Sequence, residues 1–234
     1  MAALLSDQIQ TLTTDQVPAL ATAKIAALSG EQLDALLTDQ LQTLTSSQIA
    51  AISSSALPSL SENDLATLST DQVKAFTSTQ LPSMTTSQLS SLTTSQVSAL
   101  LTAQLNALSS TQFNALTAEQ LQALTQSQVA SLSTSTLSSL SNTNFAELTS
   151  DQISVLNTDQ IPSLLTSQVS VLTTDQIGGL TSTQLRALTT AQLAALTTDQ
   201  LPAMSATQVQ AFTATQINLL STQQLTSLTA SEIT

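Results

Sequence analysis

The chain has 234 residues and a net charge of −12, from 15 acidic against three basic residues, and it contains no cysteine, histidine, tryptophan or tyrosine. Three basic residues cannot form the positive surface that contact with nucleic-acid phosphates requires, so we expect no nucleic-acid partner. Without histidine and cysteine, the chain lacks the commonest general base and the most reactive nucleophile, and its many serines and threonines have no evident base. We therefore expect no catalytic residues and no enzymatic activity.

The apolar segments predict neither a membrane span nor a signal peptide. All of them are shorter than the roughly 18 residues that a membrane-spanning helix needs. Residues 1–5 lack the basic start and long apolar core of a signal peptide. The absence of cysteine makes folding independent of redox state, which suits an extracellular or cell-surface location. We expect no membrane insertion and no cofactor.

From Leu4 onward, an eight-residue unit, here called the octad, repeats about 29 times without insertion or deletion. Residues 12–19, which read LTTDQVPA, show the pattern. In order, the eight positions hold Leu; Thr or Ser; Thr or Ser; Asp, Ser or Thr; Gln; Ile, Leu or Val; a variable residue; and a small residue. So short a period predicts one continuous solenoid array over residues 1–234.

Each octad carries the signature of a helix N-terminus. In a capping box, the hydroxyl at position 2 accepts a hydrogen bond from the backbone N–H of Gln at position 5, and the Gln side chain reaches back to the N–H of position 2. Positions 1 and 6 fall where a hydrophobic staple would lie. The pattern predicts one very short helix per octad. The predicted capping residues are Thr13, Gln16, Thr173, Gln176, Thr197 and Gln200.

The apolar positions 1 and 6 predict the core. A single octad buries too little apolar surface to offset the entropy lost on ordering it, so stability must come from stacked copies, as in a solenoid. The predicted core residues include Leu12, Val17, Leu20, Leu116, Leu121, Leu172 and Ile177.

These observations favour an all-α fold, a narrow solenoid of very short capped helices. One long helix is disfavoured because the apolar columns recur on average about every 4.0 residues, whereas a helix needs about 3.6. A β-solenoid remains the alternative. A strand through residues 16–20 would place Val17 and Ala19 inside but Leu20 outside, unless the Thr pair formed a corner.

The prolines and some leucines depart from the octad pattern. All five prolines occupy position 7, where an α-helical N–H would be bonded, so we expect the helix to end early there, as a 3₁₀ turn. Leu replaces the capping hydroxyl at Leu5, Leu37, Leu101 and Leu165, and this spacing of four or eight octads indicates four octads per turn. The residues at 231–234 keep the octad register, so no capping segment is visible and we expect end-to-end self-association.

Three polar features of the octad could form binding sites. Carboxylates at position 4, such as Asp15 and Asp175, could bind calcium, but Ser and Thr interrupt the column, so we interpret the acids as helix-dipole caps and predict no metal site. The Gln column fails at Ala56, Asp64, Thr136 and Asn144, either as neutral drift or to mark a bend or docking site. The Thr and Ser pairs could present a regular face to ice or a polysaccharide.

The octad resembles the Ser/Thr/Gln-rich short tandem repeats of large secreted bacterial proteins, including repeat-rich adhesins. The resemblance runs along the whole chain and depends on the LTTDQV motif of residues 12–17 and its copies. It implies an extracellular, non-enzymatic role and transfers no functional residue. We expect a bacterial surface stalk, spacer or filament-forming scaffold. The alternative is a binding module, with any surface ligand unknown.

Overall fold

The computed structural model describes residues 5–228, and these residues form short helices joined by turns. The α-helices have four to six residues and the 3₁₀ helices have three. No residue of this described range lies in a β-strand. The fold is an all-α solenoid, and for this range the β-solenoid alternative is wrong.

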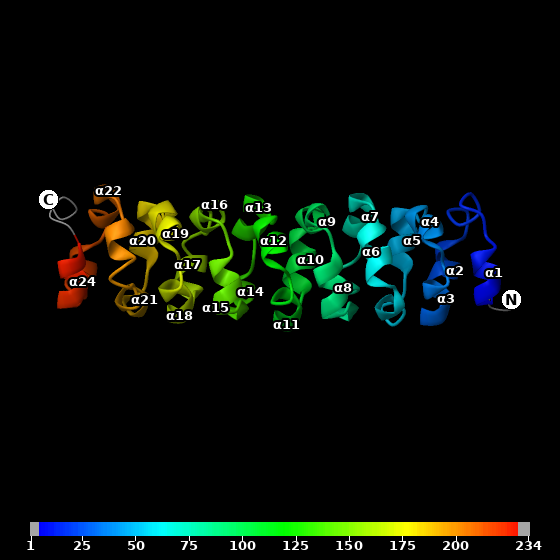
Figure 1. The fold of residues 1–234 in the computed structure, drawn as a ribbon, viewed down its shortest axis with the longest axis horizontal. Helices are drawn as coiled ribbons and strands as arrows, with labels where there is room; N and C mark the ends of the chain where they lie inside the picture. The colour runs from blue at the N-terminus through cyan, green and yellow to red at the C-terminus, as the bar shows by residue number, and fades with distance from the viewer. Residues whose placement is uncertain (1–4, 229–234) are drawn as a thin grey trace. The chain divides into compact units, whose positions relative to one another are not determined.

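The chain forms two compact units, Met1–Ala123 and Leu124–Thr234 (Figure 1). The helices of the first unit are α1 (Ser6–Gln10), α2 (Thr22–Ala26), α3 (Gly30–Asp34), α4 (Thr38–Gln42), α5 (Ser46–Ala51), η1 (Leu57–Ser59), α6 (Glu62–Thr67), α7 (Thr70–Ala75), η2 (Leu81–Ser83), α8 (Thr86–Ser91), α9 (Thr94–Ala99), α10 (Thr102–Ala107), α11 (Ser110–Phe113) and α12 (Ala118–Gln122). Those of the second are α13 (Gln126–Ala130), α14 (Thr134–Ser139), α15 (Asn142–Ala146), α16 (Ser150–Ser154), α17 (Gln160–Ser163), α18 (Thr166–Ser170), α19 (Thr174–Gly179), α20 (Ser182–Ala187), α21 (Thr190–Ala194), η3 (Leu201–Ala203), α22 (Ala206–Val209), α23 (Ala214–Ile217) and α24 (Thr222–Ser227).

A typical octad is helical for about one and a half turns and extended at its boundary. Helix α8 begins after Thr85, whose backbone is extended, with φ −73° and ψ 160°. It ends before Leu92, which is also extended, with φ −60° and ψ 139°. The capping residue starts the helix and the next Leu leaves it, so the chain changes direction once per octad.

The proline octads form shorter helices, as the missing N–H requires. Pro58, Pro82 and Pro202 lie in the 3₁₀ helices η1, η2 and η3. Pro162 lies in the four-residue helix α17, and the octad of Pro18 forms turns without an assigned helix.

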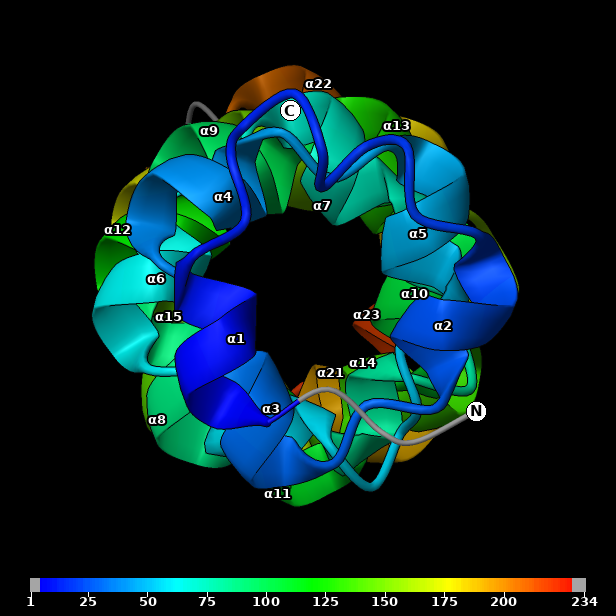
Figure 2. The ribbon, with the colours of Figure 1, turned by 90° about the vertical axis from the view of Figure 1, so that its right-hand side faces the viewer.

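Within each unit, a helix packs against the helix three octads further along the chain. In the first unit α5 contacts α7 and α7 contacts α9, and in the second α16 contacts α19. Figure 2 shows the helices of the first unit, from α1 to α4, following one another around a common axis. Hydrogen bonds described below join residues 28 and 31 positions apart, so a turn takes more than three but fewer than four octads. The leucine spacing had indicated four.

The core consists of the position 6 side chains together with most of those at position 1. Val17, Leu121 and Ile177, at position 6, have no exposed surface. At position 1, Leu116 and Leu172 are buried. The predicted core residues Leu12 and Leu20 are only half-buried, and both lie in the first described turn. Residues 231–234, which continue the octad register, lie outside the described range.

Candidate functional site

The capping boxes have the geometry that the octad pattern implies. The Thr13 N–H donates to Gln16 Oε1 at 2.9 Å, and the Gln16 N–H donates to Thr13 Oγ1 at 3.2 Å. The pair Thr173 and Gln176 makes the same two bonds at 2.7 and 3.2 Å. Thr197 and Gln200 make them at 2.9 and 3.2 Å. Each of these octads thereby satisfies two of the N–H groups that a helix N-terminus leaves unbonded.

The glutamine side chain also connects one turn to the turn before it, which sequence reasoning did not predict. In Gln88, Oε1 accepts from the Thr85 N–H at 2.9 Å, as in any capping box. Its Nε2 donates to the Leu57 carbonyl at 2.9 Å and the Leu60 carbonyl at 2.7 Å, 31 and 28 residues earlier. The side chain is 2% exposed and uses both of its amide hydrogens in these bonds.

This arrangement recurs in both units, and we call the buried glutamines that make it the glutamine ladder. Each donates from Nε2 to one or more backbone carbonyls of an earlier turn. In the first unit the ladder comprises Gln40, Gln48, Gln72, Gln80, Gln88, Gln96, Gln104, Gln112 and Gln120. In the second it comprises Gln152, Gln160, Gln168, Gln176, Gln184, Gln192, Gln200, Gln208, Gln216 and Gln224.

One signal in the sequence could have revealed the ladder. A capping box accepts Glu as readily as Gln, because only the side-chain oxygen is used. Yet position 5 holds Gln in most octads and Glu only at Glu232. A near-exclusion of Glu indicates that the amide hydrogens are needed as well as the oxygen.

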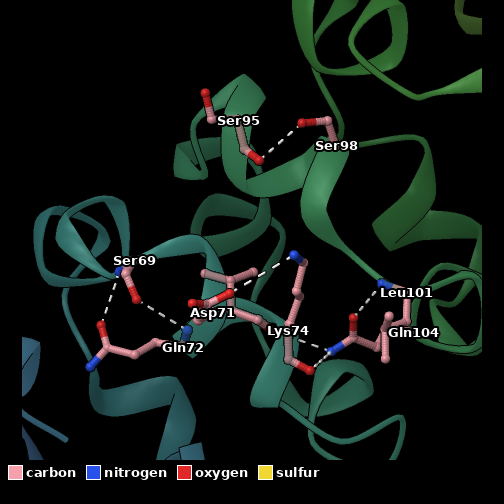
Figure 3. Close-up of polar contacts among 9 residues, drawn as sticks. Ser69, Asp71, Gln72, Lys74, Ser95, Ser98, Leu101 and Gln104 are labelled. Atoms are coloured by element: carbon pink, nitrogen blue, oxygen red, sulfur yellow. Dashed lines mark hydrogen bonds and ion pairs between the residues drawn. The ribbon is translucent and has the colours of Figure 1, made fainter. Parts of the chain in front are cut away.

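The ladder persists where the capping hydroxyl is missing, as Figure 3 shows for part of the first unit. Gln104 Oε1 accepts from the Leu101 N–H at 2.6 Å, and its Nε2 donates to the Lys74 carbonyl at 3.2 Å. The Leu101 side chain is 53% exposed and cannot cap. The ion pair between Lys74 and Asp71, at 3.9 Å, joins two well-exposed side chains and contributes little stability.

In the first unit, the ladder is interrupted at Ala56 and Asp64. Ala56 is buried and has no side-chain donor. Asp64 accepts from the Ser61 hydroxyl at 2.6 Å and from the Thr38 hydroxyl at 2.9 Å, 26 residues earlier. The carboxylate therefore keeps one link to an earlier turn, but it cannot donate to a carbonyl as Gln does.

Several acidic residues at position 4 lie in the first turn of a helix, among them Asp7, Asp39 and Asp175. Glu119 is fully exposed in the first turn of α12, where a hydrogen bond from its own backbone, followed by one from Thr117, lowers the pKa of its carboxyl. Residues 5–228 contain no group of three or more acidic residues, histidines or cysteines that could hold a metal ion. Asp15 and Asp175 accordingly lie outside any such cluster.

Repeated capping boxes joined by a glutamine ladder define an α-solenoid built from tandem repeats. Comparison with protein families supports the presence of tandem repeats, since the ALTTAQ repeat matches residues 97–134 and 178–206. A search of curated proteins found no match. The two matched segments include some of the ladder residues, such as Gln112 and Gln192.

Proposed function

We propose that this chain is a non-catalytic structural repeat protein that acts as a stalk, spacer or scaffold. The glutamine ladder is the observation that carries the proposal. Each ladder residue joins its own turn to the turn before it, so the turns of a unit stack in chain order. In such a quasi-one-dimensional structure, the span of a unit is set by the number of octads it contains. This property is what a spacer requires.

The chemistry of the side chains supports a role without catalysis. The sequence has no histidine or cysteine, and its polar residues are mainly Ser, Thr and Gln. Their described hydrogen bonds serve caps and turn contacts, as in Thr85 with Gln88. Groups with these partners stabilise the fold and do not activate a nucleophile.

We further propose that the chain works outside the cell, at a bacterial surface. The resemblance of the octad to repeats of secreted bacterial proteins supports this location, as does the absence of cysteine. None of the described helices is long and apolar enough to cross a membrane. Antibody labelling of intact cells tests the proposal, and labelling only after cell lysis would contradict it.

A spacer must hold fixed distances between its turns, which spin labels can measure inside the first unit. The chain has no cysteine, so labels attach only at cysteines that are introduced. Thr14, Ser46, Ser78 and Ser110 are exposed and four octads apart. We would pair Thr14→Cys with Ser46→Cys, Ser78→Cys or Ser110→Cys. The distance should increase at each step, with a narrow distribution, because the turns stack in order.

The control for these distances is the same pairs in urea, where broad distributions are expected. Broad distributions in buffer, or a distance to residue 110 no longer than that to residue 46, would contradict a rigid spacer.

The alternative function, a Thr and Ser face for ice or a polysaccharide, gains no separate support. Because a turn is not a whole number of octads, equivalent hydroxyls of successive turns are not aligned.

A further inference from the structure

The ladder is interrupted at two consecutive octads of the first unit, those of Ala56 and Asp64. A glutamine at these positions would donate to carbonyls 28 and 31 residues earlier, as Gln88 does. Neither alanine nor a carboxylate has an amide hydrogen to donate. The interruption therefore falls on one contact between two turns, formed by residues 25–36 and residues 53–64, which we call the seam.

The same two turns are joined by the ladder away from the seam. Gln40 donates to the Leu12 carbonyl at 2.7 Å, and Gln48 donates to the Leu20 carbonyl at 2.9 Å. The turn that follows is joined to its predecessor by four ladder residues in succession, Gln72, Gln80, Gln88 and Gln96. The two turns that meet at the seam are therefore held by ladder bonds along one side only.

Backbone groups at the seam lack the partners that the ladder provides elsewhere. Within residues 5–228, no side chain donates to the carbonyls of Leu28 and Leu36. In the same range, the N–H groups of Ser53 and Ser61 have no acceptor, because the capping oxygen of a glutamine is missing three residues later. Unbonded backbone groups destabilise a contact from which water is excluded, and opening the seam hydrates them.

Packing and one side-chain bond close the seam. Helix α3 packs on η1, and Gly30 allows Ser59 to approach closely, because a Cβ atom on Gly30 would overlap Ser59 Oγ. The Thr38 hydroxyl, next to the seam, donates to Asp64 Oδ1 at 2.9 Å. Leu60, in the middle of the seam, is 4% exposed. The closed form is thus well packed but has no amide bonds between its turns.

We infer that the seam is a hinge that opens locally while the rest of the first unit stays folded. In a quasi-one-dimensional fold, each contact between neighbouring turns contributes its own share of stability, so the contact with the fewest bonds opens first. Gln40 and Gln48 keep the other side closed, so the two turns separate at the seam and the array bends there. The inference goes beyond the proposed spacer function, because it gives the spacer one flexible point.

Two single-thiol variants of the 234-residue chain compare the seam with a contact that the ladder joins. Leu60 lies between the two interrupted octads, and Met84 lies between the ladder residues Gln80 and Gln88. Both follow a Leu-Pro-Ser 3₁₀ helix, both are 4% exposed, and each N–H bonds the carbonyl three residues earlier at 3.0 Å. The sequence has no cysteine, so Leu60→Cys or Met84→Cys introduces a single thiol.

A chromogenic disulfide reagent measures how fast each thiol reacts in buffer, because a buried thiol reacts only when its contact opens. We expect Leu60→Cys to react roughly tenfold faster than Met84→Cys, with little dependence on low urea concentrations, since a local opening exposes little surface. Ala56→Gln together with Asp64→Gln restores the ladder donors. This double change should slow the reaction of Leu60→Cys to the rate of Met84→Cys and leave the rate of Met84→Cys unchanged.

Equal rates of the two thiols would overturn the inference, as would a Leu60→Cys rate that the restored donors do not slow. Hydrogen exchange of the wild type needs no variant, and the Leu60 N–H should exchange roughly tenfold faster than the Met84 N–H. Equal exchange of these two groups would also reject the hinge.

The hinge and the spacer function can fail separately. The open form is a minor population, so the spin-label distances within the first unit should stay narrow. Narrow, increasing distances together with equal thiol rates would reject the hinge and leave the spacer function in place. Broad distances in buffer would contradict the spacer function, whatever the thiol rates are.

Discussion

At the residue scale, the distinction between Gln and Glu at position 5 decides whether turns attract or repel. Both side chains offer an oxygen to the capping N–H, but only Gln offers two hydrogens to the previous turn. In a buried position such as Gln88, a carboxylate would face two carbonyl oxygens at the distances where Nε2 now donates. The octad thus uses one side chain for a local contact and a long-range contact.

Gln88→Glu should destabilise the first unit by about 3 kcal/mol or more, because two donors are lost and a charge is buried. Lowering the pH from about 7 to about 4 should recover part of the loss, since the buried carboxyl titrates with a raised pKa and its protonated form can donate again. Urea unfolding followed by circular dichroism measures both effects. Gln16→Glu is the matched control, because Gln16 caps its octad but is exposed. Equal losses at both sites would show that the inter-turn bonds contribute nothing.

At the element scale, the sequence predicts the local structure well because its determinants lie within eight residues. The capping box at Thr173 and Gln176, the start of α19 and the 3₁₀ helix at Pro82 all follow from neighbouring side chains. Neighbouring side chains do not predict which turns pair, because the pairing depends on the glutamine Nε2 donating to carbonyls 28 and 31 residues away. No local pattern encodes that distance, and the leucine spacing suggested a slightly larger turn.

The contribution of the ladder to stability can be tested by introducing a glutamine at Ala56, where the ladder is interrupted. In the comparable proline octad, Gln80 accepts from the Thr77 N–H at 2.7 Å and donates to the Ile49 and Ile52 carbonyls at 2.9 and 2.7 Å. Ala56→Gln should recreate these contacts with an earlier turn and stabilise the first unit by about 1 kcal/mol.

The thermal unfolding midpoint measures this gain. Ala50→Gln serves as the control, because Ala50 is exposed at position 7 and a glutamine there has no ladder partner. A midpoint that falls with Ala56→Gln and stays unchanged with Ala50→Gln would indicate that the buried site is too tightly packed for a ladder residue.

At the scale of the whole molecule, the charge opposes folding while the contacts between turns are neutral. The net charge is −12, and the exposed ion pair of Lys74 and Asp71 offsets little of it. A high net charge destabilises a compact state by self-repulsion. The turns are joined through Gln side chains and apolar side chains, by short-range hydrogen bonds and apolar contact. Salt screens the repulsion over about 10 Å at 0.1 M and leaves those contacts largely unchanged.

We therefore expect the thermal unfolding midpoint of the wild type to rise as salt increases from about 0.01 M to about 0.15 M, because the Debye length falls from about 30 Å to about 8 Å and the self-repulsion is screened. Circular dichroism at fixed protein concentration measures the change. The hydrogen bonds of the ladder and the apolar contacts join neutral groups, so screening should leave them largely unchanged. A midpoint that falls with salt would mean that favourable ion pairs stabilise the fold, and the net charge would then not oppose folding.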